Sequence, residues 1–164
     1  MHTNSTASAK SITKSIESRA TYQLHTEIII EAAPEQVWAV LMDFAAYPAW
    51  NPFIRTLEGQ QEVGSTLQAE IHPPEGSPMT FKPELLVLDE HREFRWLGKL
   101  FVSGLFDGEH VFQLERLANG HTRFVQAEYF KGILVPLMRK MLDVQTRAGF
   151  EAMNRALRDQ VLNG

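Results

Sequence analysis

Glu128 is the ionisable residue of this sequence whose surroundings best suit it for chemistry. It lies near the end of a strand-like stretch, between apolar and aromatic neighbours. A carboxyl group that faces an apolar cavity loses hydration, which raises its pKa and suits it for proton transfer. Arg123 and Tyr129 are rival candidates, because alternate side chains of a strand point to opposite faces and neither face is cleanly apolar. An exposed or ion-paired Glu128 is the alternative, and the sequence leaves the orientation open.

Other motifs that carry chemistry are missing from the sequence. There is no cysteine, which excludes disulfides, thiolate metal sites and a cysteine nucleophile. The six histidines show no paired H-x-x-x-H spacing, and there is no P-loop, G-x-G-x-x-G motif or nucleophile elbow. We therefore expect no metal and no cofactor, and the sequence contains no recognisable set of catalytic residues.

A second group of residues has the size and flexibility to line a pocket for an apolar ligand. Aromatic rings offer large, rigid apolar walls, whereas methionine adapts its shape and alanine leaves space. The candidate ligand-binding residues are Trp50, Phe81, Trp96, Phe112, Met138, Met141 and Ala152. The alternative is that these side chains fill an ordinary core, with Trp50 anchoring a short helix against a sheet.

The elements that must position these residues begin with a strand over 24–32, where apolar and polar residues alternate. Pro34 fits the first turn of a helix, which is followed by a second short helix before Pro52. Strands and turns fill the middle of the chain. The pair Asn119-Gly120 predicts a hairpin, because both residues tolerate the positive φ of a tight turn.

After Gly132 the apolar period changes from 2 to 3.6, which predicts one helix from about Pro136 to about Leu162. Strands joined in series by short turns form antiparallel sheets, with helices gathered on one face. The sequence therefore predicts the α+β class, with a curved antiparallel sheet of about seven strands, two short helices and a long C-terminal helix around an apolar cavity.

The overall composition limits the possible partners. The formal net charge is −4 at pH 7, which argues against nucleic-acid binding. No apolar run reaches the length of about 18–20 residues needed for membrane insertion. Residues 1–20 are rich in Ser and Thr and predict a flexible leader, with a transit peptide as the alternative, and 21–164 predict a single domain. A soluble, cytoplasmic protein is expected.

The chain resembles the START-like SRPBCC superfamily, and within it the polyketide cyclase/dehydrase and lipid-transport branch. The resemblance extends over about residues 22–162, and it rests on the segments 28–38, 43–44, 47–52, 94–96, 120–123 and 128–132. It implies a helix-grip fold with a deep pocket between the sheet and the C-terminal helix. Members of the superfamily bind or transform lipids, sterols, polyketides, quinones and plant hormones.

Three functional hypotheses follow. The first is the binding or carriage of a small hydrophobic ligand, such as a lipid, a quinone or a polyketide-like molecule. The second is a cyclase- or aromatase-like enzyme in which Glu128, Tyr129 or Arg123 moves protons. The third is a protein-interaction module that binds its partner through a basic face of the last helix. The alternative is that this face is simply exposed to solvent. Its cations are Arg139, Lys140, Arg147, Arg155 and Arg158.

Overall fold

The computed structural model describes residues 19–164 of the chain, and residues 1–18 of the predicted leader lie outside the described residues. The strands are β1 (Tyr22–Ile30), β2 (Ile54–Glu58), β3 (Gln68–Ile71), β4 (Met79–Phe81), β5 (Glu84–Asp89), β6 (Glu93–Leu100), β7 (Phe106–Arg116) and β8 (Thr122–Lys131). The helices are α2 (Pro34–Met42), η1 (Phe44–Ala46), α3 (Tyr47–Trp50), α4 (Val135–Met141), η2 (Leu142–Thr146) and α5 (Arg147–Asn163). The predicted α+β class is confirmed.

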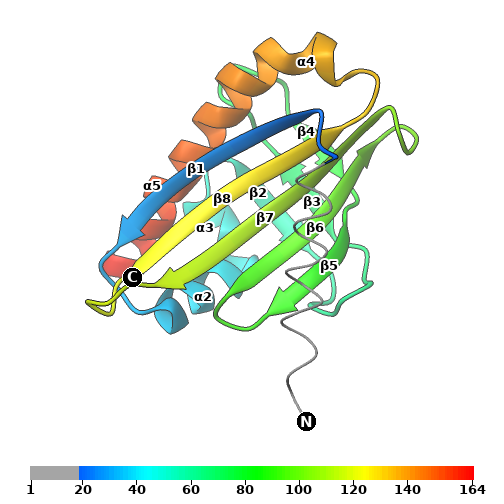
Figure 1. The fold of residues 1–164 in the computed structure, drawn as a ribbon. Coiled ribbons are helices and arrows are strands. Elements are labelled where there is room, and N and C mark those ends of the chain that lie inside the picture. The colour runs from blue at the N-terminus through cyan, green and yellow to red at the C-terminus, as the bar shows by residue number, and fades with distance from the viewer. Residues whose placement is uncertain (1–18) are drawn as a thin grey trace.

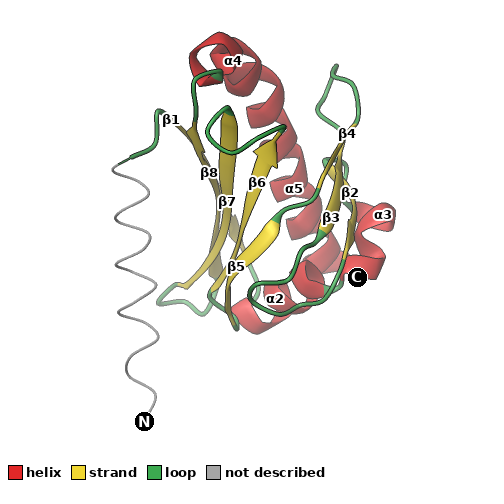
Figure 2. Ribbon diagram, turned by 90° about the vertical axis from the view of Figure 1, so that its right-hand side faces the viewer, coloured by secondary structure: helices red, strands yellow, loops and turns green. Residues whose placement is uncertain are grey.

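The strands form two antiparallel sheets. Five strands lie in the order β1-β8-β7-β6-β5, and three lie in the order β2-β3-β4. An isolated bridge between Thr66 and Glu84 connects the two sheets. Figure 1 shows the five strands side by side with the C-terminal helix behind them, and Figure 2 shows the two sheets on either side of α5. The described residues thus contain eight strands, one more than the seven or so predicted.

The C-terminal helix begins and ends within about a residue of the prediction, but it is not uniform. Pro136 lies in the first turn of α4, where a missing N–H costs nothing. Residues of η2 then form a π-helical segment between α4 and α5. Such segments are rare and often lie at functional sites. Gly149 in α5 lets the helix approach Phe53, because a Cβ at this position would overlap the ring of that residue.

The main core lies between the five-stranded sheet and the helices. Alternate residues of β1, including Leu24 and Ile30, are fully buried against it. The buried aromatic side chains of this core include Phe94, Phe112, Phe124 and Phe150. A smaller cluster on the opposite face of the sheet consists of Val111, Val125 and Ala127, with Tyr129 packed against it. Both faces of β8 therefore pack apolar side chains, and both also carry polar ones, so neither is cleanly apolar.

Candidate functional site

Two adjoining hollows lie between the inner face of β6–β8, the strands β3 and β4, and the helical segment α4–η2. Both are lined by Ile71, Phe81, Leu100, Phe106 and Glu128. Their cavity volumes are about 50 and about 60 Å³. This space suits a few water molecules, whereas sites for drug-sized ligands usually span roughly 300–1,000 Å³. A larger ligand must therefore displace side chains of the wall.

The carboxyl group of Glu128 lies where the two hollows meet. The side chain retains 16% of its exposure. Burial raises its pKa from 4.5 to about 8, so the carboxyl group is largely protonated at pH 7. Gly108 on the neighbouring strand β7 leaves space for this carboxyl group, because a Cβ at that position would collide with Oε1 of Glu128. The site thus offers one neutral carboxylic acid, both a hydrogen-bond donor and an acceptor, in an apolar wall.

His110 is the neighbour of Glu128 across the β7–β8 ladder. Its Nδ1 lies 4.0 Å from Oε2 of Glu128, which is too long for a direct hydrogen bond. Burial lowers the pKa of His110 to about 3, so the imidazole is neutral at pH 7. The ring stacks between Phe112 and Phe150, with centroid distances of 4.3 and 4.7 Å. The two groups therefore form a neutral pair rather than a salt bridge.

Gln126 determines which nitrogen of His110 carries the proton. Its Nε2 lies 3.0 Å from Nε2 of His110. In this orientation the amide donates and the ring nitrogen accepts, so the neutral imidazole carries its proton on Nδ1, toward Glu128. The same amide group lies 3.5 Å from Sδ of Met153 on α5. The buried polar groups thus form a line from α5 to the cavity.

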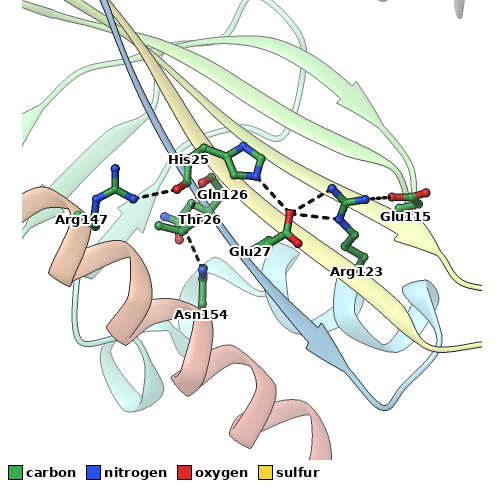
Figure 3. Close-up of polar contacts among 8 residues, drawn as sticks. All are labelled: His25, Thr26, Glu27, Glu115, Arg123, Gln126, Arg147 and Asn154. Carbon is green, nitrogen blue, oxygen red and sulfur yellow. Dashed lines mark hydrogen bonds and ion pairs between the residues drawn. The ribbon is translucent and has the colours of Figure 1, made fainter. Parts of the chain in front are cut away.

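A second buried polar contact joins the helix to the sheet beside this line. Asn154 of α5 donates to Oγ1 of Thr26 at 3.0 Å, and Thr26 donates to the backbone oxygen of Gln126 at 3.1 Å. Figure 3 shows the contact between the helix and β1. These two hydrogen bonds hold α5 against β1 and β8, although the side-chain oxygen of Asn154 has no hydrogen-bond partner among the described residues.

The structure brings together four of the residues that the sequence proposed for a pocket. Phe81 of β4 lines both hollows, and Trp96 of β6 lines the first. Met138 and Met141 line the second hollow from α4. Two aromatic side chains and two methionine side chains therefore line the hollows together with Glu128.

The other three residues proposed for the pocket line neither of the two hollows. Trp50 packs edge-on against Tyr47 at 5.1 Å and is absent from the lining of both hollows. Phe112 is fully buried and stacks on Phe94 at 5.5 Å, so it belongs to the aromatic core. Ala152 lies on α5 and lines neither hollow.

Two of the rival candidates on β8 point away from the cavity. Arg123 forms ion pairs with Glu27 and Glu115, each at 3.1 Å, on the outer face of the sheet (Figure 3). Tyr129 packs against the outer cluster that contains Val125. The alternation of β8 therefore brings only Glu128 of the three proposed catalytic candidates to the hollows.

Sequence reasoning missed the two buried polar residues beside Glu128, namely His110 and Gln126. The single histidine of this strand had no paired spacing, and a glutamine in a strand carries no signal by itself. The register of the β7–β8 hairpin is what places His110 opposite Glu128. Within residues 19–164, no group of three or more His, Asp or Glu side chains is arranged to hold a metal ion.

The fold and the site define a class of protein in which a curved antiparallel sheet and a long helix enclose a small apolar cavity. Over residues 21–161 the sequence matches the family described as polyketide cyclase / dehydrase and lipid transport. The chain belongs to this family. A search of curated protein sequences found no match.

Solved structures of distant relatives share the fold. An aromatase/cyclase, Zhui, from Streptomyces sp. R1128 is 17% identical, with a TM-score of 0.69 over 86% of this chain and 93% of that one. A protein of Thermus thermophilus is 18% identical, with a TM-score of 0.68 and coverages of 86% and 97%. A point mutant of norcoclaurine synthase from Thalictrum flavum is 18% identical, with a TM-score of 0.65 and coverages of 86% and 94%. These similarities establish the helix-grip fold.

Proposed function

We propose that this protein binds a small, largely hydrophobic molecule in the cavity and orients it through Glu128. The observation that carries the proposal is a protonated carboxyl group at the meeting point of two apolar hollows. Each Å² of apolar surface that leaves water contributes about 25 cal/mol to binding, so the aromatic and methionine walls supply most of the affinity. The family match supports a role of this kind.

The chemistry of Glu128 selects the ligand. A neutral carboxylic acid donates a hydrogen bond, so its best partner is an uncharged oxygen acceptor such as a carbonyl or a hydroxyl. Since the hollows are small, the wall must open for a lipid, a quinone or a polyketide-like molecule. Met138 and Met141 are suited to this movement, because methionine has three rotatable bonds and repacks easily.

A second candidate function is a cyclase- or dehydratase-like enzyme. It is favoured by the pKa of Glu128, because a general acid or base works best when its pKa lies near the operating pH. In this mechanism protonated Glu128 gives its proton to a ligand oxygen, or its ionised form, which grows as the pH nears 8, takes one from a ligand carbon. His110 stays neutral, and its Nδ1–H stabilises the carboxylate formed after proton donation once the two groups, 4.0 Å apart here, approach to hydrogen-bond distance.

The first experiment is native mass spectrometry of the purified protein, followed by organic extraction of any small molecule that co-purifies. A stoichiometric hydrophobic species supports the binding proposal. An empty protein that shows no thermal shift with long-chain alcohols, naphthoquinones or polyphenols contradicts it.

Substitution of Glu128 separates the two candidates. Glu128→Gln keeps the size of the side chain and a hydrogen-bond donor, so a carrier retains its ligand. An enzyme keeps the ligand but loses turnover, because the amide cannot exchange a proton. Glu151→Gln on the exposed side of α5 is the matched control and should change neither property.

A further inference from the structure

Four large apolar side chains protrude at the end of the molecule where α4 lies. Phe101 and Val102 in the β6–β7 loop are 80% and 62% exposed. Ile133 and Leu137, at the start of the C-terminal helix, are 71% and 83% exposed. Single exposed apolar residues are ordinary, whereas a group at one place marks a binding surface. We call these four residues the apolar rim.

The two segments that carry the apolar rim are joined to each other. The backbone N–H of Ile133 donates to Gly104, and that of Leu134 donates to Leu105, at 3.3 and 3.0 Å. Figures 1 and 2 show α4 and the β6–β7 loop at the same end of the molecule. The rim is therefore one surface built from two parts of the chain.

This surface lies beside the cavity. Leu100, which precedes Phe101, lines both hollows. Met138, which follows Leu137, lines the second hollow. Whatever the rim contacts therefore lies next to the wall that must open for a ligand.

The charge around the apolar rim is positive. Residues 129–142 contain Lys131, Arg139 and Lys140 and no acidic residue. Residues 99–106 contain Lys99 and no acidic residue. All four cations are exposed, although the whole chain has a net charge of −4. The rim thus differs in sign from the molecule as a whole.

The acidic residues that flank these segments are engaged in the fold. Asp107 accepts a hydrogen bond from the backbone of Gly104 at 3.0 Å. Asp143 accepts one from the hydroxyl group of Tyr22, and Arg139 lies 5.3 Å from the centre of the same ring. Glu75, in the loop between β3 and β4, is an exposed acidic residue. Asp107 pairs with Lys99 and Lys131 across the ladder, and the four cations exceed these three acids by one charge.

We propose that the apolar rim and its four cations dock on the surface of an anionic lipid bilayer, with the cavity facing the membrane. Protruding apolar side chains surrounded by Lys and Arg fit the interface of a bilayer, where apolar groups enter the acyl region and cations meet anionic headgroups. A bilayer accepts such side chains without a complementary shape, which a protein partner must supply. No helix in the described part of the chain is long and apolar enough to span a membrane, so the contact is peripheral.

The experiment is flotation of the full-length protein with vesicles of phosphatidylcholine, with and without phosphatidylglycerol, at low and high salt. We expect binding to the anionic vesicles that weakens as salt rises. The double variant Arg139→Gln/Lys140→Gln should bind about 30-fold more weakly, since each cation contributes roughly fivefold. The variant Phe101→Ser/Leu137→Ser should bind at least about tenfold more weakly, because both side chains lose their burial in the bilayer.

Matched controls are Val63→Ser, at an apolar position that is 57% exposed outside the rim, and Arg155→Gln on α5. Both should bind like the unaltered protein, and thermal unfolding checks that every variant folds. The proposal is overturned if the protein ignores anionic vesicles at low salt or if the controls weaken binding as much as the rim variants. Unchanged binding of Phe101→Ser/Leu137→Ser also overturns it. Since no ligand is needed, failure here leaves the cavity proposal standing.

Discussion

Glu128 should make the folded protein less stable as the pH rises, and Glu128→Gln should remove this effect. Below pH 4.5 the carboxyl group is protonated in both the folded and the unfolded chain, so it does not change the free energy of unfolding with pH. Between pH 4.5 and about 8 the unfolded chain loses the proton while the folded chain keeps it. Stability therefore falls by about 1.4 kcal/mol per pH unit over this window and is constant above it.

The total effect is large enough to measure. The difference between the pKa values of 4.5 and about 8 corresponds to about 5 kcal/mol of stability. Because the side chain retains 16% exposure, we expect a stability loss of about 3 to 5 kcal/mol. The assay is urea unfolding of the unaltered protein and of Glu128→Gln at several pH values from about 4.5 to 9. The stability of the variant relative to the unaltered protein should rise with pH and reach a plateau near about pH 8 to 9.

The control separates this effect from the titration of other groups. Glu151→Gln lies on an exposed helix surface and should follow the pH dependence of the unaltered protein. A difference between Glu128→Gln and the unaltered protein that stays constant over this range would refute the reasoning. It would mean that the carboxyl group is hydrated or ionised in the folded state at neutral pH.

Three further substitutions test the frame around the site. Gly149→Ala should destabilise the protein by about 2 kcal/mol in urea unfolding. Overlap of the new Cβ with Phe53 costs about 3 kcal/mol, and the better helix propensity of alanine returns only about 1 kcal/mol. A stabilised variant would contradict the close packing. Arg95→Met should cost about 3 kcal/mol, because Arg95 lies 2.7 Å from Glu109, whose pKa burial already raises; unchanged stability in the same assay would show that the pair contributes little. Gly120→Ala should cost about 1 kcal/mol because φ is +84° there, and Gly120→Asn should cost less; equal losses would argue against backbone strain as the cause.

The sequence predicted the framework well because its signals are local. Alternation in β1 and the 3.6-residue period after Gly132 each depend on a few neighbouring residues. The π-helical segment η2 carries no such signal, because its residues also suit an ordinary helix. Its residues Leu142 and Thr146 line the second hollow, so the sequence missed part of the wall.

The pocket residues were harder to predict because burial and cavity lining have the same sequence signal. Phe81 and Phe112 are both aromatic residues of strands, yet only Phe81 lines the hollows. Phe112 is covered by neighbouring rings, including that of Phe94. Which aromatic side chain meets empty space depends on how the sheet curves and on where the helix crosses it. Neither is set by a local pattern.

The orientation of Glu128 depends on one turn residue. A two-residue turn at Asn119-Gly120 would pair Ala118 with His121 and so place Tyr129 opposite His110. The structure instead has a three-residue loop, in which Gly120 has φ +84° and donates to the backbone oxygen of Leu117 at 2.9 Å.

The difference of one residue in this loop determines the chemistry of the cavity. Paired residues of a ladder share a face, so a shift of one residue exchanges the two faces of a strand. With the observed register, His110 and Glu128 share the inner face. With the alternative register, a tyrosine would share that face, and His110 would not lie beside the carboxyl group of Glu128. The outer ion pairs of Arg123 favour the observed register, because the alternative would bury this cation in the core. The orientation of β8 therefore follows from the sequence through Arg123, which is too costly to bury. No motif around Glu128 specifies it.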